Sequence, residues 1–456
     1  MNSADSKPAL SSDRTTFSAP LPAIALRNYR WEALAAWFIP LAVACVEGEV
    51  VGVVARKALN ASDLVVAAIT AAPTAALLSS LWWGRLIRGR DRVTITVALQ
   101  LGLIASVVGA ALSPATHAGS LLLLAFVYAA RVCMTGIITA RADVWRTNYP
   151  RALRVRVAGR IAAIASLVVT ITGLALASAL DLVPEEDINT AFRLGYIAAS
   201  ATALVGVWAY SRVRWRRGKS FARDERALDA ATGTDSFDIF AGARDAMRVL
   251  RDDRDYRQYL IAQFILGIAN IGLLAPFILA LDALHLSYVQ SIGLTQATPI
   301  VIALMVIPMW SRLLERSHIV RFRAMQSWVF VVSAALTCAG VLSGSMLTLF
   351  IARVVWGVAR GGGMIAWQIG HHDFAPRRLA SLYMGAHVTL TGVRGLIAPF
   401  AAIALYSGAS IAIGGGRIHI PAIGGWVFAL MAVTSAVGGA MFVRLDRQMR
   451  HKQSSV

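Results

Sequence analysis

Residues 33–55 read ALAAWFIPLAVACVEGEVVGVVA, an apolar run whose only charged members are Glu47 and Glu49. About 20 apolar residues in a helix cross the hydrocarbon core of a bilayer. A helix is the expected structure, because an isolated strand leaves backbone groups without partners in lipid. A charge near the middle of such a helix costs roughly 3 kcal/mol. The two carboxylates therefore need cationic partners or a water-filled cavity.

The same apolar pattern recurs eleven more times along the 456-residue chain, of which 57% is hydrophobic. This composition is typical of a membrane protein and not of a soluble domain. The sequence therefore predicts an all-α membrane protein with twelve transmembrane helices. The predicted spans are Ala33–Ala55, Leu64–Trp83, Val93–Leu112, Ser120–Ala140, Ile161–Leu180, Leu194–Tyr210, Tyr259–Leu281, Tyr288–Trp310, Ser327–Leu342, Met346–Trp367, Met384–Tyr406 and Ala422–Val443.

Arginines between the spans predict how the chain crosses the membrane. Loops rich in arginine follow the second, fourth, eighth and tenth spans, whereas the alternate loops are nearly uncharged or acidic. The positive-inside rule then places both termini in the cytoplasm. These loops account for the net charge of +19, so we expect no nucleic acid partner. The excess of arginine and alanine favours a bacterial cytoplasmic (inner) membrane. Arg56 and Lys57 follow the first span on the outer side, where we expect them to anchor at lipid head groups, with a role at the outer mouth as the alternative.

The two halves of the chain repeat one another. WGRLIR at residues 83–88 matches WSRLLE at residues 310–315, each directly after the second span of its half. Pro73 and Pro299 occupy corresponding places within those second spans. One repeat in each half, with the same membrane orientation, predicts two parallel, pseudo-symmetric six-helix bundles.

A polar segment in the middle of the chain divides it into domains. This linker opens with RVRWRRGK at residues 212–219, which suits anionic lipids, and continues with an amphipathic pattern of Phe237, Phe240, Met247 and Leu250. We therefore expect a helix along the membrane surface. The predicted domains are a cytoplasmic tail (residues 1–32), an N-terminal bundle (33–210), a cytoplasmic linker (211–258), a C-terminal bundle (259–443) and a cytoplasmic tail (444–456).

From residue 33 to residue 443 the chain resembles the major facilitator superfamily (MFS) of transporters, through its twelve spans, its duplicated halves and the loop after the second span. In that family this loop carries a glycine, three residues, an acid, and then basic residues around a second glycine. Here GRLIRGRDR at residues 84–92 places an arginine at the acid position, and the second half keeps an acid. The family's Gly-Pro signature of drug–proton antiporters is absent from the fifth span. The resemblance implies a cytoplasmic gate, with an inside-positive turn as the alternative, at Gly84, Arg88, Asp91 (an alternative acid), Arg312 and Glu315.

Buried charges concentrate in the first, fourth, tenth and eleventh spans, which the superfamily architecture places around a central cavity. Residues three, four and seven apart share a helix face, so the tenth and eleventh spans each carry a polar stripe. The guanidinium group can grip a carboxylate or phosphate through two bonds. The candidate solute-binding residues are Arg360, Arg394, Arg131, His387, Thr391, Asn270, Gln263 and Trp356.

Glu47 and Glu49 are the candidate proton carriers, because a carboxylate inside the membrane can gain and lose a proton during transport. Residues two apart point in nearly opposite directions on an ideal helix. We therefore expect Glu47 alone to face the cavity, unless Gly48 and Gly52 loosen the helix. Arg131 has a second interpretation, as a structural tie to one of these two carboxylates.

Together these features predict a secondary active transporter of a small anionic or carboxylate-bearing solute, working by alternating access and coupled to protons. Its expected partners are the bilayer, the solute and the proton, and its expected state is a monomer. Two alternatives stay open: an exporter of drugs, amphiphiles or lipids, and a non-transporting membrane scaffold or sensor. Catalytic, nucleotide-binding and redox motifs are absent from the sequence, so we expect no enzyme, cofactor or metal site. The adjacent His371 and His372 are expected to be solvated.

Overall fold

The computed structural model describes residues 23–232, 241–376, 379–413 and 416–454. In this part of the chain, eleven helices are long and apolar enough to cross a membrane, and the shorter segment Asp63–Ser79 stands in place of the second predicted span. The all-α, twelve-helix prediction is confirmed. The α-helices are α1 (Ala23–Ala44), α2 (Gly48–Ala58), α3 (Asp63–Ala75), α4 (Ser80–Leu86), α5 (Arg92–Ala111), α6 (His117–Asn148), α7 (Arg151–Leu182), α8 (Ile188–Ser211), α9 (Gly218–Thr232), α10 (Ala241–Asp252), α11 (Arg254–Gly272), α12 (Leu274–Ala283), α13 (Tyr288–Ile292), α14 (Thr298–Glu315), α15 (Ile319–Ser343), α16 (Met346–Ile369), α17 (Ala380–Ser407) and α18 (Val427–Ser454). An antiparallel hairpin of β1 (Ala409–Ile413) and β2 (Gly416–Ile420) joins α17 to α18.

The first predicted span is broken into two helices. Between α1 and α2, Glu47 adopts an extended conformation with φ −71° and ψ 125°. A broken helix frees backbone groups that lipid cannot satisfy. Arg131 supplies the missing partner, because its Nε and Nη2 donate to the carbonyl oxygen of Val46 at 3.0 and 2.7 Å. The directions of the two carboxylates therefore no longer follow an ideal helix.

The second and eighth spans also change their winding. In the second span, α3 passes through a 3-10 segment, η2 (Ala76–Ser79), into α4. In the eighth span, α13 passes through a π-helical segment, η4 (Gly293–Ala297), into α14. Both irregular segments lie close to a proline, Pro73 or Pro299. Proline lacks an N–H and clashes with the carbonyl four residues back, so the α-helical bond to that carbonyl is lost; for Pro299 this carbonyl belongs to Thr295, within the π-helical segment.

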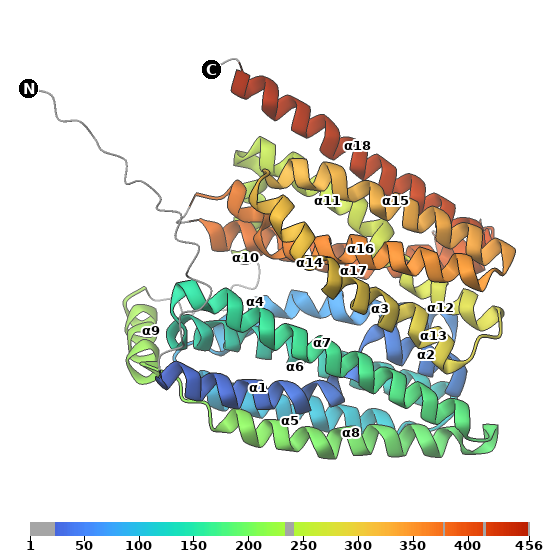
Figure 1. The fold of residues 1–456 in the computed structure, drawn as a ribbon, viewed down its shortest axis with the longest axis horizontal. Helices are drawn as coiled ribbons and strands as arrows, with labels where there is room; N and C mark the ends of the chain where they lie inside the picture. The colour runs from blue at the N-terminus through green and yellow to red at the C-terminus, as the bar shows by residue number, and fades with distance from the viewer. Residues whose placement is uncertain (1–22, 233–240, 377–378, 414–415, 455–456) are drawn as a thin grey trace, which may run out of the picture.

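The helices form two groups, as Figure 1 shows. Helices α1, α5, α6 and α8 lie in one group, and α11, α15, α16 and α18 in the other. The repeated tryptophan makes the same bond in each half: the indole N–H of Trp83 donates to the Val132 carbonyl at 2.9 Å, and that of Trp310 donates to the Val358 carbonyl at 2.8 Å. The duplication in the sequence thus has a structural counterpart.

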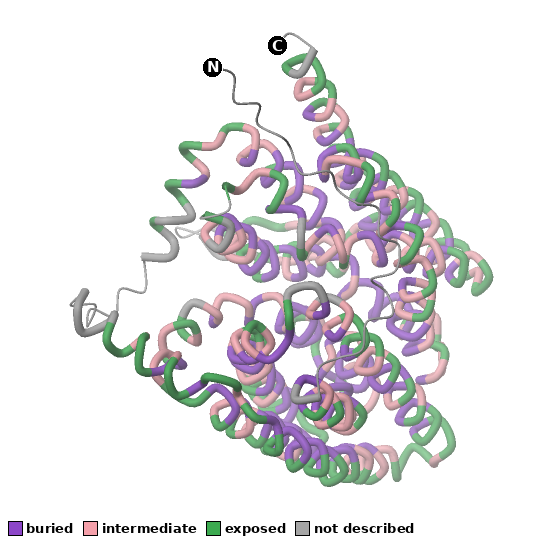
Figure 2. Tube along the Cα trace, turned by 60° about the vertical axis from the view of Figure 1, so that its left-hand side comes forward, coloured by how far each residue is buried: buried purple, intermediate pink, exposed green. Residues whose placement is uncertain are grey.

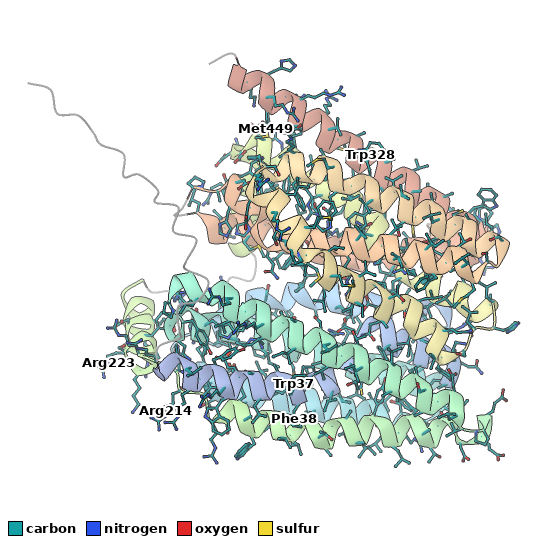
Figure 3. The ribbon with its side chains drawn as sticks, viewed as in Figure 1. Trp37, Phe38, Arg214, Arg223, Trp328 and Met449 are labelled. Atoms are coloured by element: carbon teal, nitrogen blue, oxygen red, sulfur yellow. The ribbon has the colours of Figure 1, made fainter. Side chains whose placement is uncertain are left out.

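The outside of the helical body is apolar. Trp37 and Trp328, labelled in Figure 3, expose 47% and 45% of their surface. Leu194 on α8 and Val433 on α18 expose more than half. Figure 2 places buried residues between the helices and exposed ones on the outer faces. Soluble proteins rarely expose so much contiguous apolar surface. With eleven long apolar helices among its described residues, the chain is an integral membrane protein.

The first linker helix, α9, is fixed to the first half. The buried guanidinium of Arg92 donates through Nη2 to both carboxylate oxygens of Glu225 at 2.7 and 2.8 Å, and through Nε to Asp143 at 3.0 Å. Arg214 and Arg223 lie at this same end of the molecule (Figure 3). The linker thus presents its basic side chains beside the arginine-rich loops.

The second linker helix, α10, packs on the other half. It lies against α11 and α17, where Val249 is buried and Leu250 packs on the core, while Met247 is exposed. Of the predicted amphipathic pattern, Phe237 and Phe240 lie outside the described residues. The described part of the apolar face is therefore turned toward protein.

Candidate functional site

Glu47 is paired within the first half. Its Oε2 lies 2.9 Å from Nη2 of Arg131, a side chain only 7% exposed. The same guanidinium bonds the carbonyl of Val46. Arg131 therefore binds the free carbonyl at the helix break and also balances the charge of Glu47. This is the structural role that the sequence left open as the second interpretation of Arg131.

Glu49 is paired across the two halves. Its Oε1 forms an ion pair with Nη1 of Arg360 on α16, and the two side chains are 14% and 29% exposed. The second oxygen, Oε2, is buried without a hydrogen-bond partner. Both carboxylates line the space between the halves. An ideal helix would turn Glu47 alone toward it, but the helix is interrupted at Glu47, so Glu49 can face the same space.

A central cavity of about 530 Å³ lies between the halves, within the usual size range of small-molecule sites. Aromatic walls at Phe330 and Trp367 and hydroxyls at Thr70 and Thr74 accompany its charged groups. The lining continues to Gln368 at the predicted cytoplasmic end of α16. The predicted site residues that line it are Glu47, Glu49, Asn270, Trp356 and Arg360.

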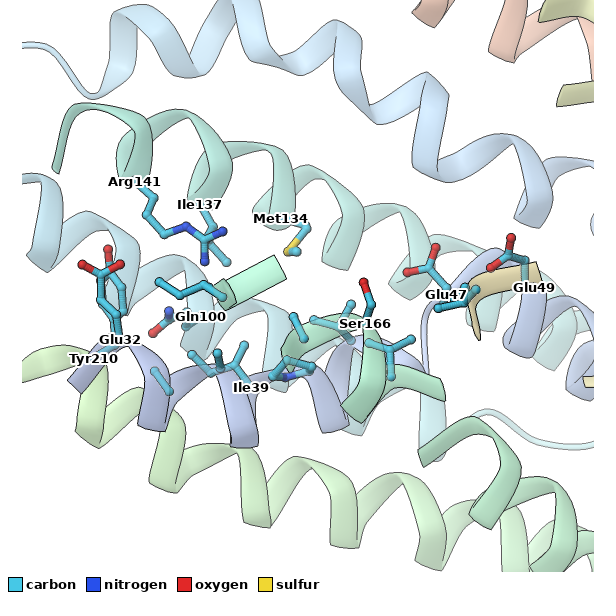
Figure 4. Close-up of a pocket in the computed structure, with 18 of the residues that line it drawn as sticks. Glu32, Ile39, Glu47, Glu49, Gln100, Met134, Ile137, Arg141, Ser166 and Tyr210 are labelled. Atoms are coloured by element: carbon cyan, nitrogen blue, oxygen red, sulfur yellow. The ribbon is translucent and has the colours of Figure 1, made fainter. Parts of the chain in front are cut away.

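A second, smaller cavity of about 240 Å³ branches from this region into the first half; we call it the side cavity (Figure 4). It shares Glu47 and the Glu49–Arg360 pair with the central cavity and runs to Glu32 and Arg141. Two aromatic side chains donate hydrogen bonds to Glu32, one of them a tyrosine hydroxyl at 2.8 Å. Glu32 is a buried carboxylate outside the set predicted from the sequence, because it immediately precedes the first predicted span.

Arg353 holds the π-helical turn in the second half. Its Nε donates to the carbonyl oxygen of Leu294 at 3.0 Å, and the side chain is 1% exposed. The guanidinium carbon lies 4.8 and 5.0 Å from the ring centroids of Phe277 and Trp356, a cation–π arrangement. Like Arg131, it binds a backbone carbonyl at an irregular helical segment.

Arg394 lies inside the second half. Its Nη1 donates to the Gln263 carbonyl at 2.6 Å and its Nη2 to the Thr391 hydroxyl at 3.3 Å. The ring of His387 packs 5.5 Å from that of Trp367, which lines the central cavity. Arg394, Gln263, Thr391 and His387 line neither cavity, so the structure does not bring Arg394 and Arg360 together as the sequence predicted.

A group of polar contacts joins the halves at the predicted extracellular end, and we call it the outer lock. Nε of Arg56 lies 2.8 Å from Asp282 of the second half, and Nη1 lies 3.1 Å from Asp63. Lys57 donates to the carbonyl oxygen of Leu286. Arg56 and Lys57 therefore bind the other half of the protein at the outer mouth, which favours the alternative role that the sequence left open over lipid anchoring.

Asp181 completes the outer lock from α7. Its carboxylate accepts hydrogen bonds from the backbone N–H groups of Tyr288 at 2.7 Å and Val289 at 2.8 Å, at the start of α13. A carboxylate at a helix N-terminus also interacts favourably with the helix dipole. The sequence offered a signal for this contact, since acids occur at the outer ends of the fifth and seventh spans, but their partners were not visible in it.

The loop after the second span receives its acid from the linker. Glu225 on α9 accepts from the N–H of Gly89 at 2.9 Å and from Arg92, 133 residues away in the sequence. Asp91, the alternative acid, instead caps α5 by accepting from the N–H of Thr94 at 2.8 Å.

The other predicted gate residues lie at the same end of the molecule. Gly84 is part of α4, and Arg88 lies in the turn before α5. Arg312 and Glu315 are exposed in the last turn of α14. A side chain added at Gly84 meets no heavy atom within 4 Å. In the present conformation, therefore, no neighbouring segment packs closely against Gly84, although a glycine at a gate would allow such packing.

Two duplicated helical bundles, an interrupted helix and a cavity crossed by an ion pair define a membrane transporter of the two-bundle type. The sequence profile of the Major Facilitator Superfamily matches residues 31–399, and the chain belongs to this family. Its membership points to a transporter and not to an enzyme.

Solved transporters share this fold at low sequence identity. A POT family transporter in complex with 5-aminolevulinic acid has a TM-score of 0.66 and 12% identity, over 92% of this chain and 96% of that one. The nucleoside transporter NupG has a TM-score of 0.64 and 12% identity, over 92% and 98%. The xylose transporter XylE from E. coli has a TM-score of 0.61 and 9% identity, over 92% and 99%. No curated protein matches the sequence.

Proposed function

We propose that this protein is a proton-coupled secondary active transporter of a small carboxylate-bearing solute. The observation that carries the proposal is the Glu49–Arg360 ion pair, which crosses from one half to the other within the central cavity. An arginine held by a carboxylate of the protein can exchange that partner for a carboxylate of a solute, because both offer the same two-oxygen geometry.

Proton coupling follows from competition for Arg360. While Glu49 is ionised, it occupies the guanidinium and excludes a solute anion. When Glu49 takes up a proton, it becomes a weak partner, and Arg360 is free to bind the solute. Glu47 keeps its own partner, Arg131, which is also bonded to the backbone. We therefore assign the moving proton to Glu49, and to Glu47 a supporting role.

Alternating access requires that each end of the cavity can close. The outer lock supports closure at the extracellular end in the present conformation. At the cytoplasmic end, we propose that the loop containing Gly84, Arg88 and Asp91 and the turn with Arg312 and Glu315 approach when the halves rock. In this scheme residues 33–210 and 259–443 move as the two bundles, joined by the linker at residues 211–258.

The proposal places both termini in the cytoplasm of a bacterium and the protein, as a monomer, in the inner membrane. The arginine-rich loops support this orientation. They lie at the end of the molecule where the linker carries further basic residues, Arg214 before α9 and Arg223 on α9, a position suited to anionic lipid head groups (Figure 3).

A ligand screen on the purified protein tests the proposal. We expect small carboxylates, such as acetate, lactate, succinate or benzoate, to raise the melting temperature more strongly at acidic pH, where Glu49 can be protonated. Arg360→Gln is expected to abolish the shift. Stabilisation by amphiphilic cations alone, such as tetraphenylphosphonium, would instead favour the exporter alternative, and no response to either class would favour a scaffold.

A further inference from the structure

We propose that the second half contains a binding site for a small inorganic anion, formed by Arg323, His371, His387 and Arg394, and we call it the inner anion site. These residues come from α15, the turn after α16, and α17, at the predicted cytoplasmic end of the C-terminal half. The site is distinct from the central cavity, and it does not depend on which solute the protein transports.

Two guanidinium groups are buried here without a carboxylate. Arg323 and Arg394 are 2% and 5% exposed, and no ion pair joins either of them to a described residue. Arg323 donates through Nη1 to the amide oxygen of Gln326 at 2.8 Å. The Nε groups of both arginines have no hydrogen-bond partner. Buried charges that lack a counter-charge are strongly unfavourable, so the arrangement calls for an anion.

Two histidines add further hydrogen-bonding groups to the same cluster. Nε2 of His387 and Nδ1 of His371 are buried without partners, and the two residues are 4% and 7% exposed. Burial has the largest effect on His387, and smaller electrostatic effects come from the nearby Arg394, Arg323 and His371. The expectation that His371 is solvated is wrong, although its neighbour His372 is exposed. Burial, with a smaller effect of His372, lowers the pKa of His371 to about 4, so its neutral ring can donate one hydrogen bond at pH 7.

The nearest acid is already engaged. Asp373 accepts a hydrogen bond from the N–H of Ile319 at 2.7 Å, where it caps α15. Its electrostatic effect reaches Tyr259, beside Arg323, but no bond joins it to either guanidinium. The cluster thus retains a net positive charge that the described side chains do not balance.

The packing favours a small ion over a lipid or a large solute. All four residues of the site are less than 10% exposed, which excludes a lipid head group approaching from the membrane. His387 does not line the central cavity, and the ring of Trp367, which does, packs 5.5 Å from the His387 ring. A Cβ at Gly267 would lie 2.0 Å from Nη1 of Arg394, so this glycine is needed for the guanidinium to take its place.

The test uses the full-length protein in detergent at constant pH and ionic strength. Sodium chloride, nitrate or phosphate replaces sodium gluconate, whose anion is much larger than the other three, and the melting temperature is followed as a function of concentration. We expect a saturable rise in wild type. Arg394→Gln and Gly267→Ala should weaken the apparent anion affinity at least about tenfold, because each removes or displaces a charged donor. Arg316→Gln, which removes a charge from the exposed end of α14, is the matched control and should keep the wild-type response.

Two results would overturn the proposal. One is an identical wild-type melting temperature in all four salts, and the other is an unchanged anion response in both Arg394→Gln and Gly267→Ala. If a variant folds poorly, the tryptophan fluorescence of the wild-type protein is measured instead, because Trp367 packs on His387. Anion binding should alter the emission, and Trp367→Phe should remove that change. Stabilisation by phosphatidylglycerol vesicles but by none of the inorganic anions would also contradict a small-ion site.

Discussion

Asp282→Asn should shift the conformational equilibrium toward a state open to the outside. In the outer lock, Asp282 from the second half pairs with Arg56 from the first half. The carboxylate oxygen lies 2.8 Å from Nε of Arg56, and the Asp282 and Arg56 side chains are 30% and 29% exposed. A partly exposed ion pair of this kind contributes about 0.5–1 kcal/mol. If that energy is present only while the outer end is closed, its loss raises the population of the outward-open state roughly two- to fivefold.

A second residue of the outer lock, Asp181, also stabilises the closed outer end. Asp181→Asn removes the charge that caps α13 through the N–H groups of Tyr288 and Val289, a further contribution of about 1 kcal/mol. A simple sum of the two changes is about 1.5–2 kcal/mol, or a roughly 10- to 30-fold shift for the double variant, and a departure from this sum would measure the coupling of the two carboxylates through Lys57.

The assay is labelling of a single cysteine in the central cavity. The three native cysteines, Cys45, Cys133 and Cys338, are replaced by serine or alanine, and Asn270→Cys provides a reporter in the cavity wall. Intact cells are treated with a membrane-impermeant maleimide, and the initial labelling rate reports the outward-open population. The labelling rates of the variants should exceed that of the wild type by the factors given above. The wild-type rate should itself rise at high salt, because salt screens exposed ion pairs.

The control is Asp187→Asn, which removes an acid from the same end of the molecule without breaking a capping bond. Equal labelling of wild type and Asp282→Asn would refute the reasoning. So would an equal increase in Asp187→Asn, because the effect would then come from surface charge and not from the lock.

Four further predictions follow from the site and the linker. Glu49→Gln should abolish gradient-driven transport but spare solute counterflow, whereas Glu47→Gln should chiefly lower the melting temperature; equal transport loss without destabilisation would contradict this division. Arg360→Lys keeps the charge but loses the planar fork, so solute affinity should fall at least about tenfold while the melting temperature changes little. Alkaline phosphatase fused at Val456 should be inactive, and strong activity would reverse the topology. Glu225→Gln should speed trypsin cleavage within α9 roughly tenfold, because a buried charge-assisted pair is weakened.

The spans were predictable because their signal is local. A run of about 20 apolar residues reports its own burial in lipid, and all twelve predicted spans correspond to helical segments. The break at Glu47 was not predictable in the same way. It depends on Arg131, whose guanidinium arrives from a helix 85 residues away to bond the Val46 carbonyl.

The candidate site was only partly predictable. Helical periodicity shows which polar residues share one face of a helix, but not which other helix packs against that face. Glu49 and Arg360 were both identified, yet their pairing joins residues 311 apart. Arg394 shares a stripe with His387 and was assigned to the same cavity as Arg360, but its face of α17 is turned toward α11, where Gln263 binds it. The outer lock was overlooked because its charges were interpreted as topology signals.

The 3-10 segment η2 explains how the two repeats tolerate different lengths. Ten positions lead from Pro73 to Trp83, but eleven lead from Pro299 to Trp310. A 3-10 helix rises about 2.0 Å and turns about 120° per residue, against about 1.5 Å and 100° in an α-helix. Four residues of η2 therefore gain about 2 Å and 80°, close to the advance of the one residue that is missing. The tighter coil restores the phase of the helix, so that each indole still meets the backbone of the fourth span in its own half.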